Sequence, residues 1–105
     1  MAEESAYVWY QQGDLTIKPV PKIPHRATAT HHRLLAAGEA GRKHIAEAED
    51  VGLFLHEGTL FMRAPTGTTV VHQDRQTLQI PPGDYVIGQV RKYDHFAVDA
   101  DDLRD

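Results

Sequence analysis

Short runs of apolar residues, alternating with polar ones and ended by turn-forming residues, fill most of this chain. The pattern is clearest from Val51 to Phe96, where β-branched and aromatic residues gather in short segments. Such residues fit a pleated, half-buried surface, and short runs bounded by glycine and proline are typical of strands. The expected strands cover residues 7–10, 15–17, 53–55, 60–62, 68–72, 78–80 and 85–92.

Turn signals separate these strands at regular intervals. A glycine-containing loop at His56–Thr59 predicts a β-hairpin between the strands that flank it. Ala64–Gly67 and Pro81–Asp84 place proline and glycine where β-turns use them. By contrast, the three prolines at positions 19, 21 and 24 exclude a central strand or a helix interior. The segment VPKIPHR (residues 20–26), with Pro19 before it, is therefore expected to form an extended edge or crossover segment.

The section from Thr28 to Asp50 leaves two interpretations open. Its alanine, leucine, glutamate and arginine content favours a helix on propensity, but Gly38 and Gly41 would each cost roughly 1 kcal/mol inside one. We therefore predict two strands, at residues 33–37 and 43–48, around a turn at residues 38–41. A short helix is the alternative.

These elements predict one all-β domain over residues 1–105, built as a small antiparallel barrel or sandwich. A jelly-roll or cupin-like arrangement is the first expectation, and a β-clip-like barrel is the second. Residues 94–105 carry five aspartates against one arginine. We expect them to form an acidic tail or a short terminal helix that begins near Asp99.

Composition narrows the function classes more than it identifies one. The chain has no cysteine, which excludes disulfides and thiolate zinc sites and favours a cytoplasmic location. No apolar run approaches the ~18 residues of a membrane span, and a net charge of −4 makes nucleic-acid binding unexpected. No nucleotide-binding, zinc-protease or nucleophile-elbow motif is present, and the one serine, Ser5, lies near the terminus.

Three pieces of sequence resemble a group of small uncharacterised bacterial and phage-associated β proteins. They are Gly13-Asp14-Leu15 with Pro19, Gly38-Glu39 with Gly41-Arg42-Lys43-His44, and His72-Gln73-Asp74-Arg75 with Leu78-Gln79-Ile80-Pro81-Pro82-Gly83-Asp84-Tyr85 and Arg91-Lys92-Tyr93. The resemblance implies a compact β fold and carries no established activity. Similar sequences often have histidine pairs where this chain has Arg42 with His44 and His72 with Arg75.

The chain also resembles cupins in its histidines and its Pro-Gly turn, which implies a divalent metal held by His44 and His72. The two histidines would lack nearby carboxylate ligands, because in a strand Glu47 and Glu49 would point to the face opposite His44. The alternative for His44 and His72 is a place on a solvated sheet face. Arg42 and Arg75 are candidates for gripping a phosphate or carboxylate, and a surface ion pair is the simpler interpretation.

The sequence therefore predicts a small binding or assembly module without catalysis of its own, with itself or another protein as the partner. One alternative is a cupin-like metal or small-ligand protein that uses His44 and His72. Another is an accessory protein of a phage or bacterial gene cluster that binds a partner protein. Arg42, His44, His72 and Arg75 are the candidate site residues in each case where a ligand binds.

Overall fold

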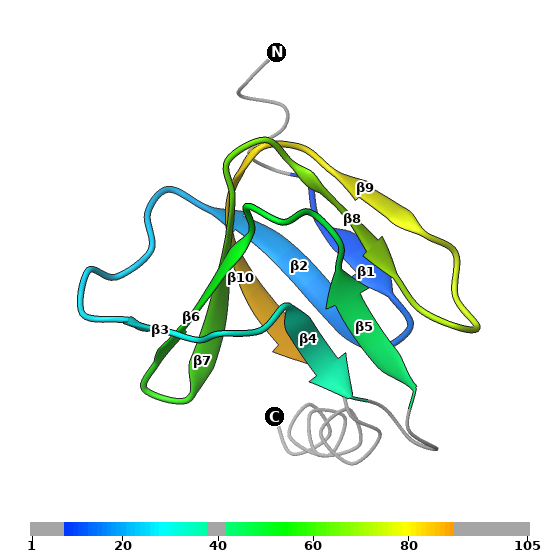
Figure 1. Ribbon diagram of the computed structural model, residues 1–105, viewed down its shortest axis with the longest axis horizontal. Helices are drawn as coiled ribbons and strands as arrows, with labels where there is room; N and C mark the ends of the chain where they lie inside the picture. Colours follow the sequence, from blue (N-terminus) through cyan, green and yellow to red (C-terminus); the bar gives the residue numbers. More distant parts are fainter. Residues whose placement is uncertain (1–7, 38–41, 90–105) are drawn as a thin grey trace, which may run out of the picture.

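A computed structural model describes residues 8–37 and 42–89, and these residues form strands, turns and connecting segments. The strands form two antiparallel sheets (Figure 1). The described strands are β1 (Tyr10–Gln12), β2 (Leu15–Val20), β3 (Thr28–Ala29), β4 (Leu34–Ala37), β5 (Lys43–Ala46), β6 (Gly52–His56), β7 (Thr59–Ala64), β8 (Thr68–Val71), β9 (Leu78–Ile80) and β10 (Gly83–Gln89). The all-β prediction is confirmed, and over the described ranges the strands form two separate sheets instead of one closed barrel.

The larger sheet has the strand order β1-β2-β10-β7-β6-β3. Its centre is β10, which pairs with β2 on one side and with β7 on the other, so Ile87 lies opposite both Ile17 and Leu60. β1 covers only the first half of β2, from Leu15 to Ile17. Pro19 follows in the half that has no β1 neighbour, where a residue without an N–H is tolerated.

The smaller sheet has the order β4-β5-β8-β9 and settles the ambiguous section as strands. β5 alternates between exposed and buried residues, with His44 and Ala46 facing inward. A bulge between Leu34 and Ala36 turns the extra residue, Leu35, into the core. The helix alternative is wrong, because pairing with β8 gives β5 a partner that local propensity does not reveal. The expected turn at residues 38–41 lies outside the described residues.

The predicted turns form where glycine permits a left-handed backbone. Glu57 and Gly58, with φ of 50° and 80°, join β6 to β7. Positive φ at both central residues is typical of the two-residue type I′ turn, which matches the twist of paired strands. In the second turn the Gly67 N–H donates to Ala64 O at 3.1 Å. The hairpin and this turn are therefore confirmed.

Several strand boundaries differ from the predictions. β2 continues to Val20 and so includes Pro19, and β5 ends at Ala46, two residues before the expected end. The first strand begins at Tyr10 and continues to Gln12, while Trp9 is 65% exposed and lies over the ammonium group of Lys18. β8 ends at Val71, one residue before His72. The last strand begins at Gly83, inside the segment expected to turn. Residues 94–105, with the expected tail or helix, lie outside the described residues.

The core lies between the two sheets and is mostly aliphatic. Burying each large aliphatic side chain contributes about 1.5–3 kcal/mol relative to leaving it in water. Its inner members include Leu15, Ile17, Leu35, Ala46, Leu53, Met62, Val70, Ile80, Tyr85 and Ile87. One polar side chain on β1 and one on β5, Gln12 and His44, are buried with it. They bring polar chemistry into the space between the sheets.

Candidate functional site

The four predicted site residues meet at one end of the smaller sheet. Arg42 and His44 come from β5 and the residue before it, and His72 and Arg75 come from the connection between β8 and β9. The ring centroids of His44 and His72 are 4.3 Å apart. Pairing of Ile45 with Val71 and of Ala46 with Val70 explains this contact, because the same register places His44 opposite His72.

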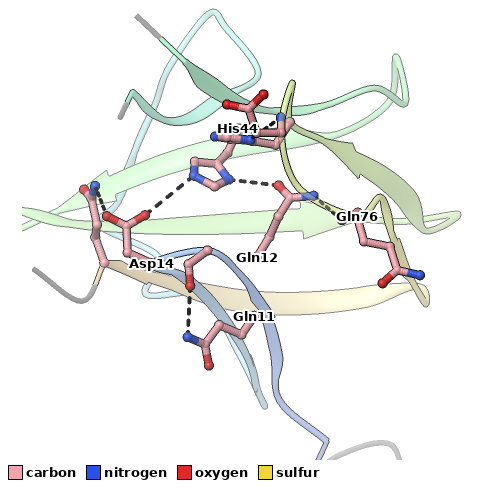
Figure 2. Close-up of polar contacts among 9 residues, drawn as sticks. Gln11, Gln12, Asp14, His44 and Gln76 are labelled. Carbon is pink, nitrogen blue, oxygen red and sulfur yellow. Dashed lines mark hydrogen bonds and ion pairs between the residues drawn. The ribbon is translucent and has the colours of Figure 1, made fainter. Parts of the chain in front are cut away.

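Gln12 holds His44 from the larger sheet (Figure 2). Its Nε2 donates to Val70 O at 3.0 Å and to Gln76 O at 2.9 Å, which uses both amide hydrogens. Its Oε1 lies 2.8 Å from Nδ1 of His44. An amide oxygen only accepts, so Nδ1 of His44 must carry the hydrogen and donate it.

The other nitrogen of His44 faces a carboxylate. Its Nε2 lies 3.7 Å from Oδ1 of Asp14, whose Oδ2 accepts a hydrogen bond from Gln89 Nε2 at 3.3 Å. The His44 side chain is 2% exposed, whereas that of Asp14 is 45% exposed. In the neutral ring Nε2 has no hydrogen, so only protonated His44 forms an ion pair with Asp14.

Burial lowers the pKa of His44 from its ordinary value of 6.5, and the neighbouring His72 and Arg75 lower it further. The carboxylate of Asp14 acts in the opposite direction, since it favours the charged ring. The net direction is downward, so His44 is held neutral at physiological pH. A neutral ring suits its donor bond to Gln12.

His72 is fixed by its own loop. The backbone N–H of Asp74 donates to Nδ1 of His72 at 3.1 Å, so the neutral ring carries its hydrogen on Nε2. Arg42 and His44 also contact this loop. Arg42 forms an ion pair with Asp74 at 2.6 Å, and His44 contacts the His72 ring. The two partners of the ion pair are about half exposed, with side chains 52% and 48% accessible. The expected surface ion pair of Arg42 is therefore present.

Arg75 packs across the β1–β2 turn. Its Nε would lie 3.0 Å from a Cβ placed on Gly13, whose φ is +62°. Glycine at this position permits both the left-handed turn and the close approach of the guanidinium group. Arg75 thereby joins the β8–β9 connection to the turn that carries Asp14.

The sequence-based predictions missed Gln12 and Asp14 as site residues, and Asp14 appeared only within the resembling piece Gly13-Asp14-Leu15. Gln12 occupies the same strand face as Tyr10 and is 2% exposed. A polar residue in phase with an aromatic one was the available signal for a buried amide. Its partner was not visible, because His44 lies 32 positions away.

Glu47 is exposed directly after β5, on the face opposite His44, as strand parity predicted. Glu49 is exposed in the turn that follows, where strand parity does not apply. Across residues 8–37 and 42–89, no group of three or more histidine, cysteine, aspartate and glutamate side chains is placed to hold a metal ion. Metal binding by His44 and His72 stays a prediction, to be tested directly.

The His44 ring is not positioned to exchange a proton with a substrate. Both of its nitrogens face protein atoms, and the ring is buried. Gln12, Asp14, His44, His72 and Arg75 form a polar cluster. This polar cluster connects β5, the β1–β2 turn and the β8–β9 connection through hydrogen bonds and packing. No helix in the part of the chain that the structure describes is long and apolar enough to cross a membrane.

A protein-family model, described as a domain of unknown function (DUF8820), matches residues 11–90. The chain therefore belongs to this family, which agrees with the resemblance to uncharacterised proteins. The match begins at the second residue of β1 and extends past the end of β10, so it includes every residue of the polar cluster. Comparisons with curated proteins and with solved structures gave no significant match.

Proposed function

We propose that this domain is a non-catalytic assembly module that binds protein through the outer face of its smaller sheet. The supporting observation is an apolar row, made of Leu34, Ile45 and Val71, that crosses this face. Leu34 lies opposite Ile45, and Ile45 lies opposite Val71. Ile45 is 37% exposed although it is a large aliphatic residue.

The row borders a shallow hollow of about 380 Å³ lined by Lys43, Ile45, Val71, His72 and Gln73. An exposed apolar patch with polar residues at its edge is typical of a protein-binding surface. Gln12, Asp14 and the buried His44 lie on the other side of β5 and contact one another, while His72 also lines the hollow. The polar cluster supports the position of β5 and offers little to a substrate.

The use of this face can be tested by site-directed crosslinking, because the chain has no cysteine of its own. A photoactivatable maleimide crosslinker would be attached to Ile45→Cys and irradiated in an extract of the source cells. The matched control is Leu55→Cys, since Leu55 is 47% exposed on β6 of the larger sheet. We expect a discrete adduct from position 45 only.

The adduct would then be identified by mass spectrometry and its binding measured with purified chains. Ile45→Lys should weaken this binding at least about tenfold, while Leu55→Lys should not. Both exposed substitutions should change the free energy of unfolding by less than about 1 kcal/mol. An adduct pattern that is the same at positions 45 and 55 would refute the proposal.

A second candidate function is the binding of a metal or small ligand, as in cupins. The observation that favours it is the contact between the His44 and His72 rings, with the Asp14 carboxylate close to Nε2 of His44. Both Nδ1 atoms are engaged in hydrogen bonds, so only the Nε2 atoms would serve as ligands. A metal titration separates this function from the first one.

A further inference from the structure

β5 and the residue that follows it present oppositely charged residues on the two sides of Ile45. Lys43, Ile45 and Glu47 are exposed, while His44 and Ala46 between them are buried. Side chains two apart on a strand lie on the same face, about 6.6 Å from one another along it. Lys43 and Glu47 therefore flank the apolar row at nearly equal distances. The ion pairs recorded within the described residues include neither of them.

This pattern is complementary to itself. When a twofold axis lies along the apolar row, the second copy presents the same face with its strands reversed. Ile45 then meets Ile45 of the second copy, and Lys43 meets Glu47 twice, once on each side of the axis. A twofold interface requires such a surface, because each contact occurs in both directions.

β8, the strand next to β5, continues the self-complementary pattern. Glu47 N–H donates to Thr69 O at 2.9 Å, which places Thr69 beside Glu47. Gln73, two residues after the end of β8, lines the same hollow as Lys43. Across the axis Thr69 would face Gln73 of the second copy, two uncharged polar residues. No like charges on β5 or β8 would oppose each other in this arrangement.

We propose that the occupant of this face is a second copy of the chain, related by a twofold axis along Leu34, Ile45 and Val71. This inference rests on the proposed function and specifies its partner. The two twisted sheets would pack face to face at about −30° and about 10 Å apart. Lysine and glutamate side chains are long enough to meet across that separation.

The size of the face sets the expected affinity. Four strands spaced about 4.8 Å apart and about four residues long give a projected face of roughly 200 Å². A stable complex usually buries about 800 Å² on each partner. We therefore expect a weak, reversible dimer that forms only at high protein concentration.

Sedimentation equilibrium of the full chain at concentrations up to about 1 mM tests the inference. Lys43→Glu and Glu47→Lys should each raise the dissociation constant about tenfold, because each replaces two attractions by two repulsions. An equimolar mixture of these two variants should restore association to within about threefold of the original chain. The double variant Lys43→Glu/Glu47→Lys should do the same, and the exposed loop variant Lys22→Glu should have no effect.

The outcomes separate this inference from the proposed function. A chain that stays monomeric at 1 mM overturns the second-copy inference, and so does a dimer that both charge reversals leave intact. Failure of the variant mixture to restore association overturns this twofold axis. If an adduct from position 45 then contains a different protein, the face is still a binding surface and only its partner was wrong.

Discussion

Replacing Gln12 by alanine should be among the most damaging single changes outside the aliphatic core. The amide of Gln12 makes three hydrogen bonds, of 2.8, 3.0 and 2.9 Å, to His44, Val70 and Gln76. Each such bond contributes about 1 kcal/mol net, and a buried group left unpaired costs about 1–3 kcal/mol more. The partner atoms on His44 and Val70 are buried, so we expect Gln12→Ala to lower the free energy of unfolding by about 3–4 kcal/mol.

The adjacent residue provides the control. Gln11 is exposed and makes one side-chain hydrogen bond, from Nε2 to Gly13 O at 2.9 Å. Gln11→Ala should therefore change stability by less than about 0.5 kcal/mol. Urea unfolding followed by circular dichroism measures both variants, and equal m-values would show that midpoint shifts report stability. If the two variants differ by less than about 1 kcal/mol, the buried network does not stabilise the fold as argued.

Three further predictions follow from the same structure. Because the pKa of His44 is lowered in the folded chain, the unfolded chain binds more protons just below pH 6.5. The free energy of unfolding should therefore be higher above that pH and should fall as the pH drops to 5.5. His44→Gln should reduce this pH dependence more than His25→Gln, which changes an exposed histidine. Gly67→Ala should cost at least about 1 kcal/mol more than Gly58→Ala in urea unfolding, since both glycines have positive φ but only at Gly67 would a Cβ meet backbone, at 2.7 Å from Ile80 O. Calorimetric titration with Zn²⁺ should show no stoichiometric binding, because the described residues bring no group of three or more metal-ligating side chains together. Uptake that His72→Ala removes and His56→Ala preserves would establish the metal alternative.

Local patterns predicted the strands and turns well where glycine, proline and β-branched residues act over a few positions. The Glu57–Gly58 hairpin and the Ala64–Gly67 turn are of this kind. Residues 28–50 were ambiguous because their composition suits a helix, and the outcome depended on pairing with β8, more than 20 positions further along. The same reasoning by strand parity correctly predicted that Glu47 points away from His44.

The candidate site was predictable in part for the same reason. Arg42, His44, His72 and Arg75 were identified by residue type and resemblance, and the pairing of β5 with β8 brings them together. Gln12 and Asp14 were missed because they join the cluster from the other sheet. Sequence patterns report which face of a strand is buried, but they do not report which segment of the opposite sheet it contacts.

The polar cluster has a consequence for the proposed binding face through the register of β5. In the described part of the smaller sheet β5 is only four residues long, and its ladder with β8 consists of Ile45 opposite Val71 and Ala46 opposite Val70. A slip of one residue would turn Ile45 inward and His44 outward, and the apolar row would be lost.

An apolar residue at position 44 would resist this slip only by packing. His44 adds a directional bond to Gln12, whose two amide hydrogens are held by Val70 and Gln76, so its Oε1 is fixed in place. The buried histidine is thus best understood as what keeps Lys43, Ile45 and Glu47 on the outer face.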